Sequence, residues 1–309
     1  MIDGRKVLIT GHTGQVGSRV AGFLALRCEL WGLARYSAPG SLEAAEKLGV
    51  RPLKGDLGSG ELDGIPDGLD YVIHFAASTY PATHEEGLTQ NSDACGFLMH
   101  RCREAKAFLH VSTTGVYSRN PDPHHRYRED DPLGSQTDYA PFYGGTKAAG
   151  EAVVRAFSRT LGLPATIARM NVAYGGAQGD GGLPGKLLDA VLKGDPVRIP
   201  KSYPRLQMPI HEDDIARQVE PLLAVAEVGG NIVNWSGDDV VNVEDMARYL
   251  GELTGVEPKF ERTDDGPAKS QGVVDTTKRM SLIGPCRVDW RDGFRRMAQA
   301  RTARRPIKS

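Results

Sequence analysis

The residues best suited to proton transfer are Tyr143 and Lys147, which lie four positions apart in the segment Tyr143-Gly-Gly-Thr-Lys147. On a helix, residues at this spacing share one face. A free phenol has a pKa of about 10 and is a poor base at neutral pH, whereas a nearby ammonium favours the phenolate and lowers that pKa. The pair could therefore take a proton from an alcohol or return one to a carbonyl oxygen.

Hydroxyl side chains precede this pair in the chain. Ser112-Thr113-Thr114 directly follows the apolar run Phe108–Val111, and Thr113 lies thirty residues before Tyr143. A hydroxyl at the end of a buried strand can hydrogen-bond a substrate oxygen and stabilise the charge that develops there.

A glycine-rich turn near the start of the chain is typical of a phosphate site. It follows the apolar run Lys6–Thr10 and opens a predicted helix, so that the helix N-terminus would face the negative phosphates. The first glycine makes the turn, the second lets the backbone approach a pyrophosphate, and the third lets helix and strand pack closely. The predicted cofactor contacts here are Gly11, Thr13, Gly14, Gln15, Val16 and Gly17.

Short apolar runs alternate with longer amphipathic segments in the first 170 residues, and these elements must position the three motifs. The predicted strands are Lys6–Thr10, Leu30–Leu33, Val50–Leu53, Tyr71–Ala76, Phe108–Val111 and Ala165–Arg169. The predicted helices begin near Gly14, Ser41, Glu85 and Tyr143. Because most of the strands are apolar at successive positions, both of their faces are expected to be buried. The pattern predicts an α/β fold with a Rossmann-like, doubly wound parallel sheet.

The pattern changes after Tyr174. Leu187–Leu192 and Asp213–Val225 predict helices, and Gly230–Trp235 predicts another strand. The segments Gly175–Gly182 and Lys201–Pro209 are Gly-rich or interrupted by proline and predict irregular structure. The basic segment Arg295–Lys308 predicts a solvated, partly disordered terminus.

Together, the GxxGxxG spacing, the Ser/Thr segment and the YxxxK pair resemble the extended branch of the short-chain dehydrogenase/reductase superfamily, the NAD(P)-dependent epimerase/dehydratase-like proteins. The resemblance implies a dinucleotide-binding domain over residues 1–174, with 210–236 returning to its sheet. Residues 175–309 would form mainly a smaller, mixed α/β substrate-binding domain. It also implies a homodimer that packs the helices around 85–105 and 143–161 into a four-helix bundle.

The resemblance assigns roles to individual residues. Counting back from Val116-Tyr117 makes Thr113 the catalytic hydroxyl, beside Tyr143 as acid/base and Lys147. Further cofactor contacts are implied at Asp56 and Leu57 (adenine), at Phe75, Ala76 and Ala77 (adenosine side), at Asn91, and at Ser112, Tyr143 and Lys147 (nicotinamide end). Substrate contacts are expected from Ser78, Thr79, Tyr80, Thr113, Tyr174 and Gln207.

The end of the second predicted strand bears on the choice of coenzyme. NAD-binding members carry an acidic residue there for the ribose 2′-hydroxyl, whereas this chain has Ala34 followed by Arg35. A guanidinium suits a 2′-phosphate through charge-assisted hydrogen bonds. NADP is therefore the preferred coenzyme, with NAD possible.

Four positions depart from the pattern of related enzymes. Sugar 4,6-dehydratases follow the catalytic threonine with Asp and Glu, the acid and base for eliminating water, whereas this chain has Thr114 and Gly115. Nucleotide-sugar enzymes usually place Asn where this chain has Val172, and Arg where it has Gln207. Contacts to a nucleotide diphosphate would thereby be missing or displaced.

Bulk properties narrow the remaining classes. A formal net charge of −1 over 309 residues favours neither nucleic acid nor an acidic membrane, and no run of about twenty apolar residues is present to span a bilayer. The four cysteines lack metal-binding spacing, and His124-His125 has no supporting ligands, so no metal is expected. The cysteines predict a reduced, cytoplasmic protein.

The sequence thus predicts an NAD(P)-dependent oxidoreductase that transfers hydride between the nicotinamide and an alcohol or carbonyl of a small molecule, with no nucleic-acid partner. One alternative is a nucleotide-sugar epimerase with a tightly held cofactor. From another class, the alternative is a non-catalytic dinucleotide sensor, which the complete set of Thr113, Tyr143 and Lys147 disfavours.

Overall fold

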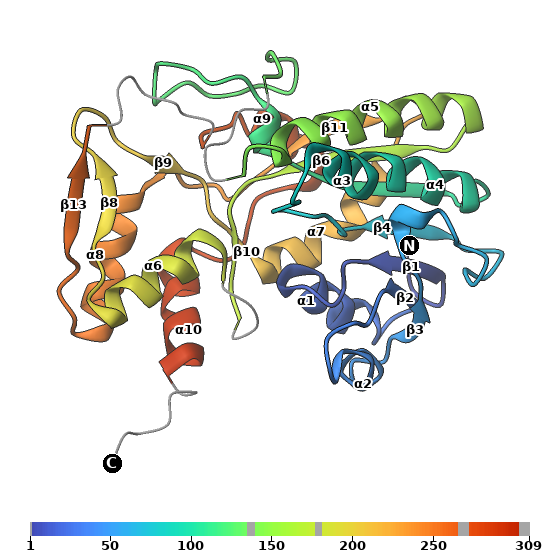
Figure 1. Ribbon diagram of the computed structural model, residues 1–309, viewed down its shortest axis with the longest axis horizontal. Helices are drawn as coiled ribbons and strands as arrows, with labels where there is room; N and C mark the ends of the chain where they lie inside the picture. The colour runs from blue at the N-terminus through green and yellow to red at the C-terminus, as the bar shows by residue number, and fades with distance from the viewer. Residues whose placement is uncertain (1, 135–139, 177–180, 265–271, 303–309) are drawn as a thin grey trace.

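The computed structural model describes residues 2–134, 140–176, 181–264 and 272–302. Its centre is a seven-stranded sheet in which every pair of neighbours is parallel (Figure 1). In spatial order the strands are β11 (Asn231–Trp235), β6 (Ala165–Met170), β5 (Ala107–Thr113), β4 (Tyr71–His74), β1 (Lys6–Thr10), β2 (Glu29–Ala34) and β3 (Arg51–Lys54). The predicted fold class is confirmed, and residues 231–235 do return to this sheet.

Helices cover both faces of the sheet. One face packs against α1 (Gln15–Leu24), α2 (Ser41–Lys47) and α7 (Glu212–Ala224). The other packs against α4 (Ala94–Arg101) and α5 (Tyr143–Leu161). Side chains alternate between these cores along each strand, as Val7 and Leu8 do in β1. Burial on both faces explains why the strands are apolar at successive positions.

Short elements connect the main ones. The helical turns are η1 (Leu57–Ser59), α3 (His84–Leu88), the π-helical turn η2 (Thr89–Asp93) and η3 (Thr114–Val116). The remaining helix beside this sheet is α9 (Thr277–Ile283), which contacts α7 and β11.

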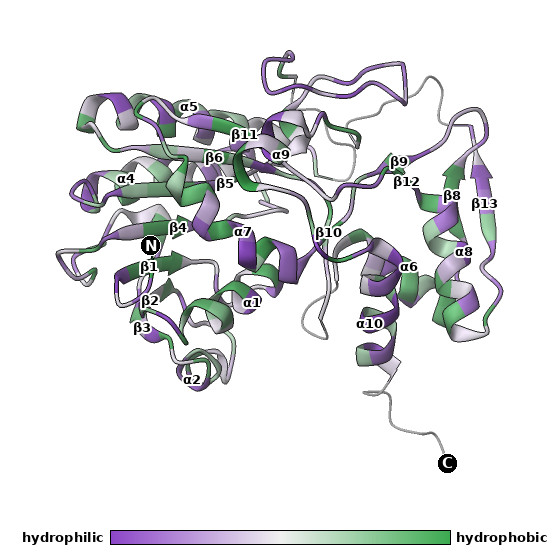
Figure 2. Ribbon diagram, turned by 180° about the vertical axis from the view of Figure 1, so that it is seen from behind, coloured by the Kyte–Doolittle hydropathy of each residue, from purple (hydrophilic) through white to green (hydrophobic). Residues whose placement is uncertain are grey.

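A second hydrophobic core lies beyond the end of the sheet. It contains side chains of α6 (Gly182–Lys193), β8 (Val197–Pro200), α8 (Val243–Thr254) and α10 (Trp290–Thr302). The strand β13 (Phe260–Thr263) pairs with β8, and Arg262 of β13 lies opposite Ile199 of β8, so the two strands differ in hydropathy there (Figure 2). Two-residue strands complete this region: β7 (Ala173–Tyr174), β9 (Leu206–Gln207), β10 (Ile210–His211) and β12 (Val241–Asn242).

Most element predictions are confirmed to within two or three residues, with two exceptions. The predicted helix Leu187–Leu192 is one part of the longer α6. The predicted solvated terminus Arg295–Lys308 is wrong for residues 295–302, which form the end of α10 with Met297 and Ala298 buried in the second core. Its residues 303–308 lie outside the described part of the chain. Within the described residues, no helix is long and apolar enough to cross a membrane.

Candidate active site

The glycine loop joins β1 to α1 and offers donors to an anion. Gly14 precedes the helix in an extended conformation, no side chain caps this end, and no acidic residue lies in the first turn. The first turn of α1 therefore offers the positive end of its own helix dipole no opposite charge. The side-chain nitrogen of Gln15 is buried without a hydrogen-bond partner among the described residues. These donors fit the phosphates of a dinucleotide.

Close packing explains two of the loop's glycines. Gly11 adopts a φ of +73°, and a Cβ at this position would lie 2.6 Å from the Ala76 nitrogen. A Cβ on Gly17 would lie 2.2 Å from the Gly11 carbonyl oxygen. The loop can therefore stay close to the ends of β1 and β4 only because these side chains are absent.

The predicted adenosine contacts lie at the carboxyl ends of their strands. The Asp56 carboxylate caps η1 by accepting the Gly58 N–H at 3.0 Å, and Leu57 is buried. Phe75, Ala76 and Ala77 directly follow β4, with the Phe75 ring centroid 6.3 Å from that of Trp235. Ligands bind at this edge in doubly wound sheets. The contacts themselves stay predictions.

Arg35 is exposed directly after β2, beside an anchor that the sequence analysis missed. The Tyr36 hydroxyl donates to the Gly32 carbonyl at 2.8 Å and lies 2.8 Å from His12 Nε2 in the glycine loop. Burial lowers the pKa of His12 to about 4, so its ring is neutral at pH 7. Tyr36 also has a φ of +47°, which is uncommon for a residue with a side chain. This contact fixes the backbone beside Arg35.

Two side-chain contacts join α5 to β5. Lys147 Nζ lies 3.4 Å from His110 Nε2, and the Ser112 hydroxyl donates to Glu151 Oε1 at 2.5 Å. Lys147 is only 1% exposed, and this burial lowers the pKa of its amine. Tyr143 is the first residue of α5, one turn before Lys147 on the same face. The structure thus places the predicted pair on the helix that lies against β5.

Glu151, which the sequence analysis did not single out, is paired with Arg169 of β6. Arg169 Nη2 lies 2.7 Å from Glu151 Oε2, and both side chains are buried. Arg169 also lies over the Tyr117 ring at 4.8 Å and donates to the Glu129 carbonyl at 3.0 Å. The sequence signal for Glu151 was its spacing, since Lys147 and Glu151 follow Tyr143 by four and eight positions on the same helix.

The hydroxyls at the end of β5 have different partners. The Thr113 hydroxyl oxygen accepts the Gly115 N–H at 3.1 Å, so its own hydrogen can be donated to a substrate oxygen. Thr114 accepts from Asn171 Nδ2 at 3.5 Å. Ser112 is buried and donates to Glu151, so a direct contact of its hydroxyl with the nicotinamide stays a prediction without support from this geometry.

Asn91 lies in the π-helical turn η2 and organises the loop after β4. Its Oδ1 accepts the Ser78 N–H at 2.7 Å, while its Nδ2 donates to the Ser78 carbonyl at 2.9 Å and to Thr146 Oγ1 at 3.0 Å. The side chain thereby connects the loop to α5. π-Helical turns occur frequently at functional sites. With both amide atoms engaged, Asn91 would act on a cofactor only through the residues it holds.

The predicted substrate residues do not all reach one surface. Tyr80 is 61% exposed, and its hydroxyl lies 3.4 Å from Lys186 Nζ of α6, so it connects the loop after β4 with the region of the second core. Tyr174 is instead 1% exposed, with its ring against Phe294 at 4.9 Å. The second core encloses its side chain, so its substrate contact stays a prediction without support from this geometry. Ser78, Thr79 and Gln207 are partly exposed.

Asn171, one place from the position where related enzymes carry asparagine, has a structural role. Its Oδ1 accepts the N–H groups of Val172 and Met208 at 2.8 and 3.3 Å, and its Nδ2 donates to the Gly272 carbonyl at 3.1 Å. These bonds hold three backbone segments together. They leave the amide little capacity to bind a substrate diphosphate.

The Glu151–Arg169 pair gives a test of this arrangement. We expect Glu151→Gln to lower the free energy of unfolding by about 3–5 kcal/mol, because it leaves a buried guanidinium without its counter-charge. Glu261→Gln is the control, since it breaks an exposed pair with Arg198 and should cost less than about 1 kcal/mol. Denaturant titration measures both. Equal effects of the two substitutions would contradict the role given to Glu151.

The sequence of this chain is similar to those of known proteins. The model of the NAD dependent epimerase/dehydratase family matches residues 7–234. A trifunctional UDP-glucose 4,6-dehydratase/UDP-4-keto-6-deoxy-D-glucose 3,5-epimerase/UDP-4-keto-L-rhamnose-reductase of Arabidopsis thaliana is 26% identical over 94% of this chain and 46% of its own length. This chain thus spans about half the length of that relative. A dTDP-glucose 4,6-dehydratase of Streptomyces niveus is 24% identical, with 94% of this chain and 90% of that protein covered.

Solved structures share the fold. The UDP-glucuronic acid 4-epimerase of Bacillus cereus in complex with UDP-glucuronic acid and NAD has a TM-score of 0.82 at 20% identity, over 96% of this chain and 99% of that one. The UDP-N-acetylglucosamine 4-epimerase of Methanobrevibacter ruminantium has a TM-score of 0.84 at 19% identity, over 98% and 99% of the two chains. The family match covers most of the chain and includes the glycine loop, the hydroxyl segment and the Tyr143–Lys147 pair, so the chain belongs to the NAD dependent epimerase/dehydratase family.

Proposed function

We propose that this chain is an NAD(P)-dependent oxidoreductase of the extended short-chain type, acting on an alcohol or carbonyl of a small molecule. The observation that carries the proposal is the buried amine of Lys147, one helical turn from Tyr143. In the part of the chain that the structure describes, no carboxylate is paired with this amine. Its charge is therefore available to stabilise a phenolate.

Each side chain has a defined task in this proposal. Tyr143 accepts the proton of a substrate hydroxyl or donates one to a carbonyl oxygen, and Lys147 lowers the pKa of that phenol. Thr113 donates its hydroxyl hydrogen to the same substrate oxygen. When bound, the nicotinamide supplies or accepts the hydride. The substrate would lie between the 1–174 body and the 175–309 body, near Tyr80.

Net oxidation or reduction is our first choice, and elimination of water is not part of it. Thr114 is neutral and bonded to Asn171, and Gly115 has no side chain, so the Asp and Glu that dehydratases use are missing. Gln207 and the engaged Asn171 also weaken recognition of a diphosphate. A substrate without a nucleotide group is the consistent choice.

Tyr143→Phe tests the proposed acid/base. We expect turnover to fall by about 10²–10⁴-fold, because no group would then transfer the proton, while coenzyme affinity changes little. Tyr249→Phe is the matched control, since it removes a hydroxyl in the second body near Arg295 and should leave turnover unchanged. Steady-state kinetics and coenzyme titration give the two readouts. Full turnover by the Tyr143 variant would refute the assignment.

A nucleotide-sugar epimerase is the second candidate, favoured by the similarity to solved epimerases. Such an enzyme regenerates its cofactor in every turnover and can keep it bound. Denaturing the purified protein and identifying the released nucleotide separates the candidates. Stoichiometric NAD(P) carried through purification would favour the epimerase, whereas an empty protein that binds NADPH reversibly would favour net redox chemistry.

We propose NADP as the preferred coenzyme because Arg35 is exposed where an acidic residue would otherwise bind the ribose. Arg35→Ala should weaken NADPH binding by about 10–100-fold through loss of a charge-assisted hydrogen bond, and NADH binding should change by less than about threefold. Arg51→Ala is the control, because Arg51 of β3 is paired with Glu29 at 2.7 Å. Equal losses for the two coenzymes would remove the case for NADP.

Two further properties belong to the proposal. A cytoplasmic location is supported by the four free cysteines. A homodimer through α4 and α5 is supported by the exposed Phe97 of α4, which is 43% accessible. Light scattering measures the mass of the purified chain in solution, and we expect the mass of a dimer. A monomer mass would contradict the proposed dimer.

A further inference from the structure

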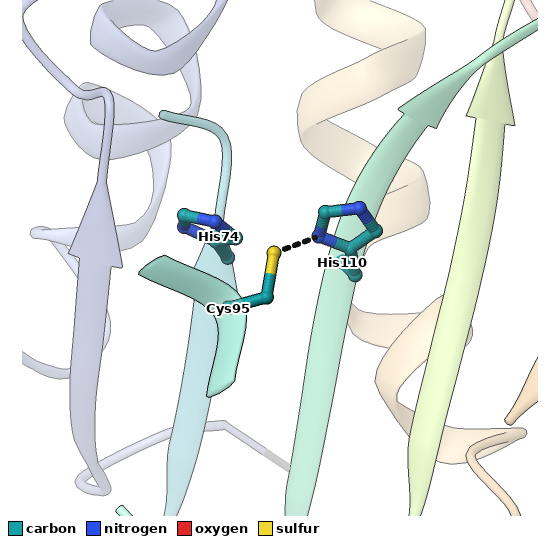
Figure 3. Close-up of side chains that lie close together, drawn as sticks. All are labelled: His74, Cys95 and His110. Carbon is teal, nitrogen blue, oxygen red and sulfur yellow. Dashed lines mark hydrogen bonds between the residues drawn. The ribbon is translucent and has the colours of Figure 1, made fainter. Parts of the chain in front are cut away.

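A buried lysine is usually paired with an opposite charge, whereas Lys147 has no such partner among the described residues. Its amine is enclosed by His110 of β5, with His74 of β4 and Cys95 of α4 beside that histidine (Figure 3). On α5 the carboxylate nearest in sequence belongs to Glu151, and it is paired with Arg169 and accepts a hydrogen bond from Ser112. The only hydrogen-bond distance to Lys147 Nζ among the described residues is the 3.4 Å contact with His110 Nε2.

The partners of Cys95 determine which nitrogen of His110 carries the proton. The Cys95 thiol donates to the Asn91 carbonyl at 3.3 Å, and its sulfur lies 3.7 Å from His110 Nδ1. With its hydrogen directed to Asn91, the sulfur can only accept, so His110 carries its proton on Nδ1. Nε2 then presents a lone pair to the Lys147 ammonium.

The two histidines and the cysteine on this side of the ammonium are neutral. Burial lowers the pKa of His74 to about 3 and that of His110 well below its usual range, and it raises the pKa of Cys95 to about 11. The nitrogen and sulfur atoms of the three residues lie within 4.8 Å of one another, a spacing that a metal ion could bridge. A bound cation would, however, lie beside the lysine ammonium with no carboxylate to offset the repulsion.

We propose that His110 is a positioning residue, which holds the Lys147 ammonium through a neutral hydrogen-bond acceptor and directs its charge toward Tyr143. The inference rests on the proposed function. A carboxylate in the place of His110 would hold the amine equally well, but it would cancel much of the field that lowers the pKa of the phenol. An apolar residue would leave a buried ammonium hydrogen without an acceptor. A neutral imidazole avoids both effects.

The first test uses the wild-type protein and does not depend on activity. ¹⁵N chemical shifts of labelled histidine, assigned with His110→Gln, report the tautomer of His110 at pH 7. We expect a protonated Nδ1 and an unprotonated Nε2. A proton on Nε2, or a ring protonated on both nitrogens, would overturn the proposal, because the lone pair facing Lys147 would then be absent.

The second test compares variants at two neighbouring histidines. His110→Phe keeps a buried ring without an acceptor, and His110→Gln restores a carbonyl oxygen near the position of Nε2. His74→Phe is the control, because His74 Nδ1 bonds to Thr10 Oγ1 at 2.7 Å and its Nε2 has no partner among the described residues. Thermal unfolding and coenzyme affinity show which variants are folded.

Loss of the acceptor should lower the pKa of Lys147, so that less ammonium remains to stabilise the Tyr143 phenolate. The pKa of Tyr143 should then rise, and the alkaline rise of kcat/KM for alcohol oxidation should move up by about one pH unit or more in His110→Phe. His110→Gln should return the profile toward wild type, and His74→Phe should leave it in place. Equal shifts in His110→Phe and His74→Phe would indicate a purely structural role and overturn the proposal.

The Lys147 pKa can also be measured directly from [¹³Cε]lysine spectra, assigned by subtraction of Lys147→Met. We expect a lower pKa in His110→Phe than in wild type or His110→Gln, and equal values in all three would overturn the proposal. This readout separates the two hypotheses. If the lysine pKa responds to His110 but Tyr143→Phe retains full turnover, the proposed function fails while the contact stands.

Discussion

The burial of one positive charge between a helix and a sheet constrains the rest of this structure. Lys147 lies on α5 against β5, with its amine almost fully removed from solvent. An ammonium in such a place must be hydrogen-bonded, or it loses its proton. The histidine, the cysteine and the asparagine carbonyl behind it form a line of neutral groups that meets this need from β5, α4 and η2.

The other buried ions of the site are arranged so that they do not interfere with this charge. Glu151 lies one turn beyond Lys147, close enough to raise its pKa electrostatically, yet its carboxylate is bonded to Arg169 and Ser112. Arg169 in turn lies over Tyr117, whose hydroxyl donates to Asn234 Oδ1 at 2.6 Å. This network connects α5, β5, β6 and β11, so the strand that returns from the second half of the chain also supports α5.

The same framework accounts for the chemistry that we do and do not propose. Relatives and structural neighbours of this chain include dehydratases and epimerases of nucleotide sugars, and the fold and the Tyr143–Lys147 pair are compatible with either group. The residue after Thr113 bears on the choice between them, because Thr114 offers a hydroxyl bonded to Asn171 and not an acid. In the proposed hydride transfer, the only side chains that the protein must supply are the tyrosine, the lysine and one hydroxyl donor.

The sheet, the glycine loop and the Tyr143–Lys147 helix could all be predicted from the sequence. Alternating apolar runs, glycine spacing and an i,i+4 pair are local patterns with direct structural causes. The sequence also located the departures at Thr114 and Gly115. It did not determine which polar residues meet across the core. In the sequence, His110 and Cys95 look like ordinary members of an apolar strand and an apolar helix, but packing brings Cys95 Sγ to 3.7 Å from His110 Nδ1. Tyr174 likewise looks accessible in the sequence, but the ring of Phe294, 120 residues later, covers it. Such contacts depend on distances between segments that are remote in sequence, and these distances follow from how the whole chain packs.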